Sequence, residues 1–448
     1  YRSVAQDIDD LSLLIPRIPV EDACIFLDSS MVQSDKSKHS ILGWRPLVTL
    51  SQENKKSFIK FDEDILESKL NFIQLLDMFN SKMVTVIHDS GDLEKLGLLG
   101  YFSYESGFGT WSFDGASLAT QKSHYPEGCF MLFEWMVIQN HNTRTWSVFQ
   151  FQHPSIKPTE WVGVEEKKTV FFAKTSPECN ITKERYLSDV RAVKSHIMDG
   201  DIYQANYSCR WSVPFEGSMY PFFNTLRQLS PTPFGGYLRT PWGEIACYSP
   251  ELFVAISEDV ILTSPIKGTR LANSVELDNH TVIKDLINSE KDKAELMMIV
   301  DLERNDLGRV CETGSVKVDR LRYRESYAHV HHMVSNISGV LKTSIRGVNA
   351  LPYLFPGGSI TGAPKTKAMT ILSKLEPYSR ELYTGSIGFL GFDNSVVLNV
   401  AIRTLYTIDQ TLYFHVGGGI VADSDPELEW QETLTKAKAI FETMEAFL

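Results

Sequence analysis

The last 63 residues of the chain, 386–448, decide the fold class: SIGFLGFDNSVVLNVAIRTLYTIDQTLYFHVGGGIVADSDPELEWQETLTKAKAIFETMEAFL. Three runs of mostly apolar residues predict three strands, at 386–392, 396–405 and 411–416. An Asp-Asn pair between the first two runs predicts a tight turn there. Asp425 and Pro426 predict the start of a helix that runs to the C-terminus, because Asp caps helices well and Pro suits the first helical position. Short strands followed by a separate helix are typical of an antiparallel sheet with helices beside it.

The rest of the chain extends this pattern. Residues 1–175 predict strands with turns between them and few helices. Amphipathic helices are predicted over 182–199, ended by a glycine, and over 281–300. Because helices and strands do not alternate regularly, we expect an α+β fold, an antiparallel β-sheet sandwich flanked by helices. A Pro-containing, charged stretch predicts a connection near 155–178, and hence two regions, 1–178 and 179–448.

The composition is that of an ordinary globular protein, with 43% hydrophobic and 22% charged residues in 448. A net charge of -12 argues against a nucleic-acid binder, which needs a basic face. No apolar run approaches the roughly 20 residues of a membrane helix. The six cysteines include no C-x-x-C pair, so reduced thiols in a cytoplasmic protein are expected.

Two pairs of acidic residues could bind a metal ion. Asp292 and Glu295 are three residues apart in one predicted helix, and Glu429 and Glu432 repeat that spacing in the last one. Four carboxylates on two helices could form an oxygen cage for Mg²⁺. The spacing alone favours solvated helix faces, on which such pairs are common. Lys436, one turn after Glu432, suits either a surface ion pair or a cation held for a substrate carboxylate.

Three glycine-rich segments could approach an anion, because glycine lets backbone N–H groups come close to a ligand. They lie at residues 355–365, 383–388 and 416–420. Ser359 and Thr361 add hydroxyl donors to the first segment. None of the segments matches the phosphate-binding pattern G-x-x-x-x-G-K-[ST], and glycine stretches are as often tight turns as ligand cradles.

Four single residues have side chains suited to catalysis or binding. Lys267 lies between apolar residues and a predicted Gly-Thr turn; it is either a nucleophile, if its amine is desolvated, or a lysine whose amine reaches solvent. Glu251 could be a general acid. His332 alone is more typical of a packed residue. Arg403, on a predicted strand, suits a carboxylate held by two hydrogen bonds.

In combination these segments resemble the chorismate-utilising enzymes, which include anthranilate synthase component I, aminodeoxychorismate synthase component I, isochorismate synthase and salicylate synthase. The resemblance implies their chorismate-binding fold and covers about residues 180–448, with residues 1–178 only loosely similar. It rests on segments in family order at 249–251, 265–269, 295–310, 332–335, 355–365, 383–388, 402–404 and 417–432.

The resemblance implies a role for each candidate residue. Glu295 and Glu432 would ligate Mg²⁺, with Asp292 and Glu429 nearby. Glu251 would protonate the departing 4-hydroxyl of chorismate. The expected substrate-binding residues are Gln204, Gly268, Thr269, His332, Ser359, Thr361, Tyr383, Arg403, Gly418, Gly419 and Lys436.

Two positions separate the branches of this family. Isochorismate and salicylate synthases carry a lysine base at the position of Gln204, and glutamine cannot activate water in that way. Anthranilate synthases typically read P-I-A-G-T where this chain reads P-I-K-G-T with Lys267. The resemblance is therefore to aminodeoxychorismate synthase component I, which makes 4-amino-4-deoxychorismate for 4-aminobenzoate and folate, here through a covalent Lys267 intermediate. The alternatives are anthranilate synthase component I and a non-catalytic chorismate-binding partner of an amidotransferase.

Ammonia is expected from a second protein. The chain has no G-x-C-x-G nucleophile turn of a glutaminase, so the resemblance implies a separate glutamine amidotransferase subunit. Several relatives bind tryptophan in their N-terminal region. Residues 26–30 and 230–234 fall where the walls of that pocket would lie but depart from its usual pattern, so the sequence leaves tryptophan binding open.

Overall fold

The computed structural model describes residues 10–29, 39–87, 96–109, 123–151, 169–271, 276–326 and 330–448. The strands are β1 (Cys24–Asp28), β2 (His39–Glu53), β3 (Lys56–Phe61), β4 (Asp64–Ser68), β5 (Gly97–Phe102), β6 (Gly128–Asn140), β7 (Thr145–Gln150), β8 (Phe171–Ala173), β9 (Glu178–Cys179), β10 (Gln204–Gly217), β11 (Phe234–Thr240), β12 (Gly243–Ser249), β13 (Leu252–Ser257), β14 (Val260–Ser264), β15 (Ile266–Leu271), β16 (Lys317–Ser326), β17 (Val330–Val340), β18 (Gly362–Ala363), β19 (Ser386–Gly391), β20 (Val396–Asn399), β21 (Thr404–Ile408) and β22 (Thr411–Ile420). The helices are η1 (Leu11–Arg17), α1 (Phe72–Ile87), η3 (Tyr104–Gly109), α2 (Lys183–Met198), α3 (Tyr220–Leu229), α4 (Glu276–Asn288), α5 (Glu290–Val310), η4 (Gly347–Ala350), α6 (Leu351–Leu354), η5 (Gly358–Ile360), α7 (Lys365–Leu375) and α8 (Pro426–Glu445).

The strands join into a curved antiparallel network around the long pair β2 and β6. From β2 the hydrogen-bonded order continues through β1, β11, β12, β21, β22 and β10. From β6 it continues through β5, β19, β20, β13, β14 and β17. Strands from both predicted regions thus pair with each other, and the boundary at residue 178 stays a prediction.

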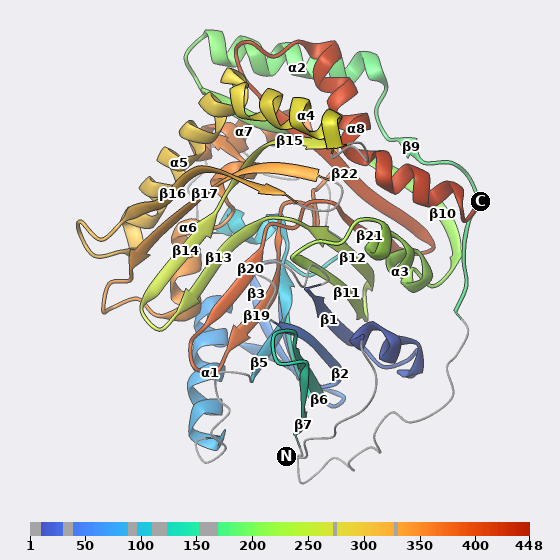
Figure 1. The fold of residues 1–448 in the computed structure, drawn as a ribbon. Helices are drawn as coiled ribbons and strands as arrows, with labels where there is room; N and C mark the ends of the chain where they lie inside the picture. The colour runs from blue at the N-terminus through green and yellow to red at the C-terminus, as the bar shows by residue number, and fades with distance from the viewer. Residues whose placement is uncertain are drawn as a thin grey trace.

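Helices cover this network at its two ends. Helices α2, α4 and α8 gather at one end of the molecule and α1 lies at the other (Figure 1). Helix α8 buries Trp430, Ala437, Ile440 and Met444, which recur every three to seven residues and so share one face. The opposite face of α8 is left for polar side chains.

The expected fold class is confirmed, and several elements lie where the sequence predicts them. Helix α2 begins after Thr182, whose side chain accepts a hydrogen bond from the Arg185 amide. Helix α8 begins at Pro426 with Asp425 as its N-cap. Strand β19 occupies most of the predicted strand 386–392.

Other predicted elements were wrong in their limits. The helix expected over 281–300 is two helices, because Ser289 ends α4 and caps α5. The strand expected over 396–405 is broken between β20 and β21, at residues 400–403. The strand expected over 411–416 continues as β22 through the three glycines to Ile420. Lys267 and Gly268 lie in strand β15 rather than at a turn.

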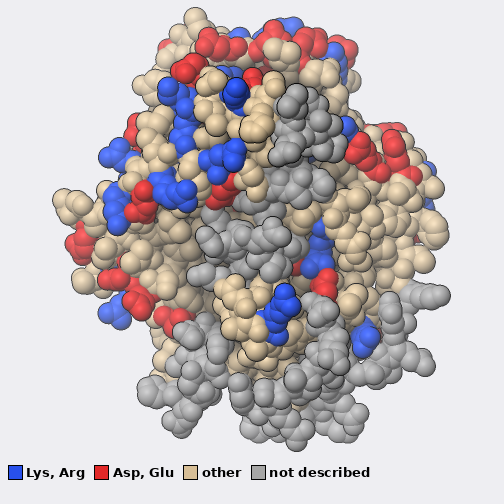
Figure 2. All heavy atoms as spheres, viewed as in Figure 1, with Lys and Arg blue, Asp and Glu red and all other residues tan. Residues whose placement is uncertain are grey.

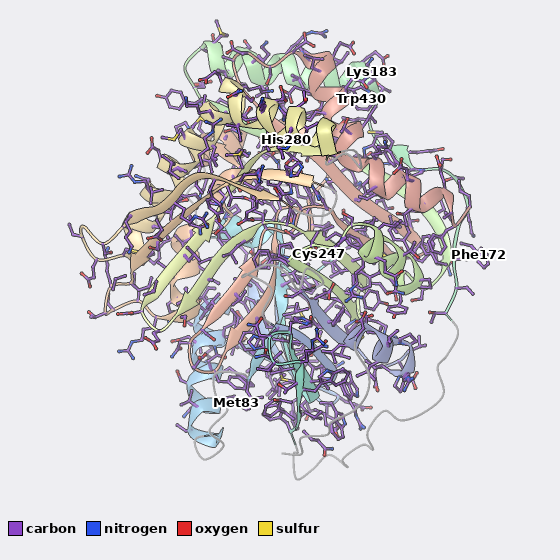
Figure 3. All side chains as sticks on the ribbon, in the orientation of Figure 1. Met83, Phe172, Lys183, Cys247, His280 and Trp430 are labelled. Carbon is purple, nitrogen blue, oxygen red and sulfur yellow. The ribbon has the colours of Figure 1, made fainter. Side chains whose placement is uncertain are left out.

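Charged side chains lie on the described surface (Figure 2), and most of the cysteines are buried. Acidic and basic side chains are interspersed over the helices at one end of the molecule in Figure 2. The six cysteines are free, and Cys247 lies in the middle of the molecule (Figure 3). Within the described residues, no helix is both long and apolar enough to span a bilayer. Residues 155–168 of the predicted connection, and Ser30 in the predicted tryptophan-pocket wall, lie outside the described residues.

Candidate active site

Lys267 lies on strand β15 next to a bulge in its pairing with β17. The bulge includes Gly268, which has a φ of +81° that glycine adopts without strain. A Cβ on Gly268 would lie 3.0 Å from Asp292 Cγ, so the glycine lets β15 approach helix α5 closely. The Lys267 ammonium donates a hydrogen bond to the Ser359 carbonyl at 3.0 Å.

Glu251 lies in the tight connection between β12 and β13 and is only 4% exposed. The Ser359 hydroxyl donates to Glu251 Oε1 at 2.8 Å. The Glu251 carbonyl accepts a hydrogen bond from the Val400 amide, which holds the connection against the break between β20 and β21. Ser359 therefore contacts both the predicted nucleophile and the predicted acid, through its carbonyl and its hydroxyl respectively.

The two acidic pairs meet in space, although about 140 residues separate them in the sequence. The Lys291 ammonium lies 3.2 Å from Glu429 Oε1 and 4.0 Å from Glu295 Oε1, and so links helix α5 to helix α8. Burial raises the pKa of Glu295, and the charges of Lys267 and Lys291 oppose that shift. The Glu432 charge raises the pKa of Glu295 further, and the Lys267 charge lowers the pKa of both carboxylates. Both carboxylates therefore lie within electrostatic range of Lys267.

Lys436 neutralises the α8 side of this cluster. Its ammonium lies 2.8 Å from Glu432 Oε1 and donates to the Gly417 carbonyl at 3.0 Å. The Lys436 charge holds the pKa of Glu432 below its ordinary value. A Cβ on Gly418 would lie 3.3 Å from Lys436 Nζ, and one on Gly419 would clash with the Gln204 amide. The glycines of β22 therefore leave room for polar groups of α8 and β10.

Arg403 is a half-buried cation without a carboxylate partner among the described residues. It occupies the break between β20 and β21 with a φ of +50°, a conformation unfavourable for a side chain other than glycine. Burial lowers the pKa of its guanidinium. A guanidinium in this situation suits a ligand carboxylate, which would supply the missing countercharge.

The remaining predicted residues lie around these groups. Thr269 Oγ1 and His332 Nδ1 are 2.8 Å apart across the β15–β17 pair. The Tyr383 ring stacks on His415 with centroids 5.2 Å apart. The Thr361 hydroxyl donates to the Gly357 carbonyl at 2.9 Å, so it stabilises its own glycine-rich loop. Gln204 is buried, and its Oε1 accepts no hydrogen bond from the described residues.

The acidic cluster suits a hard divalent cation by the chemistry of its donors, which are carboxylate oxygens. The repulsion between Glu295 and Glu432 is the interaction that such a cation would relieve. As placed, no three His, Cys, Asp or Glu side chains of the described chain converge on one point. Ammonium groups from Lys291 and Lys436 balance the carboxylates instead.

The chain is similar to known proteins over most of its length. The model of the family described as chorismate binding enzyme matches residues 27–442. This chain belongs to the chorismate-binding enzyme family. It is 33% identical to aminodeoxychorismate synthase component 1 of Bacillus subtilis (strain 168), over 91% of this chain and 89% of the relative. It is 34% identical to the protein of that name from Escherichia coli (strain K12), over 94% and 93%. The structure of anthranilate synthase component I from Streptococcus pneumoniae TIGR4 matches with a TM-score of 0.75 and 26% identity, over 91% and 93%.

The site of this chorismate-binding enzyme includes charged residues for which the sequence patterns indicate no role. They are Lys291, Glu303, Lys365 and Arg380. Glu303 lies one turn before Asp306 on α5 and on the same buried face as Val300 and Leu307. Charged residues at apolar positions of a helix are the signal that could have identified Glu303. Nothing local to Lys291 or Arg380 distinguishes them from surface charges.

Proposed function

We propose that this protein is aminodeoxychorismate synthase component I, converting chorismate and ammonia to 4-amino-4-deoxychorismate. The observation that carries the proposal is the contact of Ser359 with both Lys267 and Glu251, beside the carboxylates of α5 and α8. Two relatives that match about nine tenths of the chain bear this name, which supports the proposal. Because they are named as first components, we also propose a separate glutamine amidotransferase subunit as the source of ammonia.

In the proposed mechanism the neutral amine of Lys267 attacks C2 of chorismate. The two conjugated ring double bonds shift, the C4–O bond breaks, and the 4-hydroxyl leaves as water with a proton from Glu251. Ammonia then adds at C4, both double bonds shift back, the C2–N bond to Lys267 breaks, and the added ammonium group returns a proton to Glu251. Two such displacements place the new amino group on the carbon that carried the hydroxyl. General acid assistance of this kind is worth on the order of 100-fold in rate or more.

The substrate carboxylates have separate proposed partners. Arg403, Tyr383 and the β22 glycines would bind one carboxylate, with Lys436 close by. Glu295 and Glu432 would hold Mg²⁺, with Asp292 and Glu429 behind them, and the ion would orient the ring carboxylate by its charge. Both proton transfers in this scheme are made by Glu251, and Lys267 acts as nucleophile and leaving group.

The decisive experiment supplies the purified protein with chorismate, Mg²⁺ and ammonium. We expect no anthranilate fluorescence, and 4-aminobenzoate only after a lyase is added. Intact-mass spectrometry of the wild type should detect a chorismate-derived adduct, and Lys267→Ala should lack it and lose activity. Anthranilate production would assign the protein to anthranilate synthase instead, and absence of any turnover would favour a non-catalytic chorismate-binding role. A Lys267→Ala variant with full activity would exclude the lysine mechanism.

A further inference from the structure

The glycine-rich loop at residues 357–361 rests on helix α5 through a buried carboxyl group. Gly358 N donates a hydrogen bond to Glu303 Oε1 at 3.0 Å, and Glu303 is 6% exposed. A Cβ on Gly358 would lie 2.6 Å from Leu302 Cδ2 and 3.1 Å from Glu303 Oε1. The loop backbone is therefore in direct contact with the helix at this point, with no room for a side chain between them.

The neighbouring residue, Ser359, is the one that contacts both proposed reacting groups. Its carbonyl accepts from Lys267 and its hydroxyl donates to Glu251. A movement of Gly358 away from α5 would therefore shift both contacts at once. Misplacement of reacting groups by about 1 Å can reduce a rate by about 100-fold.

Two buried carboxyl groups of helix α5, those of Glu303 and Asp306, have different partners near the loop. Lys365, the nearby buried cation, lies 2.6 Å from Asp306 Oδ2 and also donates to the Leu354 carbonyl at 2.8 Å. Glu303 instead accepts the Gly358 amide. Burial, together with the Asp306 charge, raises the pKa of Glu303 to about 7. Burial of a carboxyl group is costly unless it is hydrogen-bonded, and the Gly358 amide supplies such a hydrogen bond.

We propose that Glu303 is a positioning residue for the reaction: its carboxyl oxygen holds the Gly358 amide and thereby aligns Ser359 with Lys267 and Glu251. This inference rests on the proposed function, because it concerns the same two reacting groups. It assigns Glu303 no contact with substrate.

The test compares two variants of similar size. Glu303→Gln keeps an oxygen acceptor for the Gly358 amide, whereas Glu303→Leu removes it. We expect Glu303→Leu to lower kcat by about 100-fold and to leave KM for chorismate within about threefold, because within the described residues no hydrogen bond or ion pair joins Arg403 or Lys436, the proposed carboxylate-binding residues, to this loop. Glu303→Gln should restore kcat to within about fivefold of the wild type. Asp301→Leu, at an exposed carboxylate on the same helix, is the matched control and should leave kcat unchanged.

Hydrogen exchange supplies a readout that does not depend on activity. The Gly358 amide should exchange faster in Glu303→Leu than in the wild type or in Glu303→Gln. Gly358→Ala, which pushes the loop from α5 without changing Glu303, should reproduce the loss of kcat. Equal losses in Glu303→Leu and Glu303→Gln, or a loss confined to KM, would overturn the positioning role. A wild type that makes no product from chorismate would instead overturn the proposed function, and this role in catalysis with it.

Discussion

Arg380 is a fully buried arginine, whereas Arg403 is half-buried. Arg380 is 2% exposed and donates to Glu376 Oε2 at 2.8 Å, to the Asn206 carbonyl at 2.6 Å and to the Ile360 carbonyl at 3.1 Å. Arg403 has no carboxylate partner within the described chain. Removing one partner of a buried ion pair is strongly destabilising, whereas removing a half-buried charge without such a partner is not. At the scale of residues, this contrast separates a structural arginine from one available to a ligand.

Arg403→Met is expected to raise KM for chorismate by about 100-fold, since truncating a hydrogen-bonded charge pair costs on the order of 2–5 kcal/mol. The free energy of unfolding should change by about 1 kcal/mol or less, because no ion pair is lost. Arg380→Met is the control and should lose about 3–5 kcal/mol of stability. Urea unfolding of both variants gives the comparison, and an equal loss in the two would contradict a ligand-binding role for Arg403.

Glu105 makes the stability of the protein depend on pH. Burial, with the charge of Glu381, raises the pKa of Glu105 from 4.5 to about 8. As pH rises from 4.5 to 8, the unfolded chain loses this proton before the folded chain does, so stability falls. Glu105→Gln keeps the acceptor for the Arg380 amide and removes the titration. The difference in the free energy of unfolding between Glu105→Gln and wild type should therefore shift in favour of the variant by on the order of 2–4 kcal/mol from pH 5 to pH 8. A pH-independent difference in unfolding free energy would refute this.

At the scale of elements, the start of α5 sets the position of two of the acidic residues. Ser289 ends α4 and its hydroxyl accepts the Asp292 amide at 3.2 Å. Asp292 and Glu295 therefore lie in the first two turns of a new helix. A single helix over 281–300 would have given these carboxylates a different direction, so the break is part of the construction of the site.

Ser289→Ala is expected to lose about 1 kcal/mol of stability, the usual cost of removing an N-cap. It should also lower activity, because the first turn of α5 frays where Asp292 lies. Thr182→Ala removes the corresponding cap of α2, where Thr182 accepts the Arg185 amide at 3.2 Å. This control should lose similar stability and keep its activity. Thermal unfolding and the steady-state assay measure the two effects, and equal activities would show that the α5 cap serves stability alone.

At the scale of the whole molecule, the curved sheet brings α5 and α8 together. Their carboxylates face each other with Lys291 between them, and the Lys267 charge acts on both Glu295 and Glu432. A cation bound between two such distant parts of the chain binds the folded state and not the unfolded one. It should therefore stabilise the entire fold.

We expect saturating Mg²⁺ to raise the unfolding temperature, with a gain of about 2.7 kcal/mol at 100 times the dissociation constant. Glu432→Gln should remove most of that gain. Glu442→Gln, at an exposed position of the same helix that pairs with Lys438, is the control and should keep it. Thermal unfolding with MgCl₂ or a chelator tests this. A Glu432→Gln variant that still gains stability from Mg²⁺ would exclude Glu432 as a ligand.

Local signals in the sequence were sufficient for α2, α8 and β19. A cap, a proline and a run of apolar residues act within one or two turns, so they can be recognised without knowledge of the neighbours. The break at residues 400–403 could not be recognised in this way, because its residues read as a continuous strand. Contacts from Glu251 and Tyr248 hold that break open.

The sequence by itself determined the α+β class, the caps of the helices and the set of residue types that chorismate chemistry requires. Only the tertiary structure decided which of these residues meet: that Ser359 joins Lys267 to Glu251, that Lys291 links α5 to α8, and that Glu303 lies under the loop. The physical reason is the separation along the chain over which each interaction acts. Backbone propensity and capping act between near neighbours in the chain, whereas the energies of buried charges depend on partners that only the folded sheet brings within a few ångströms.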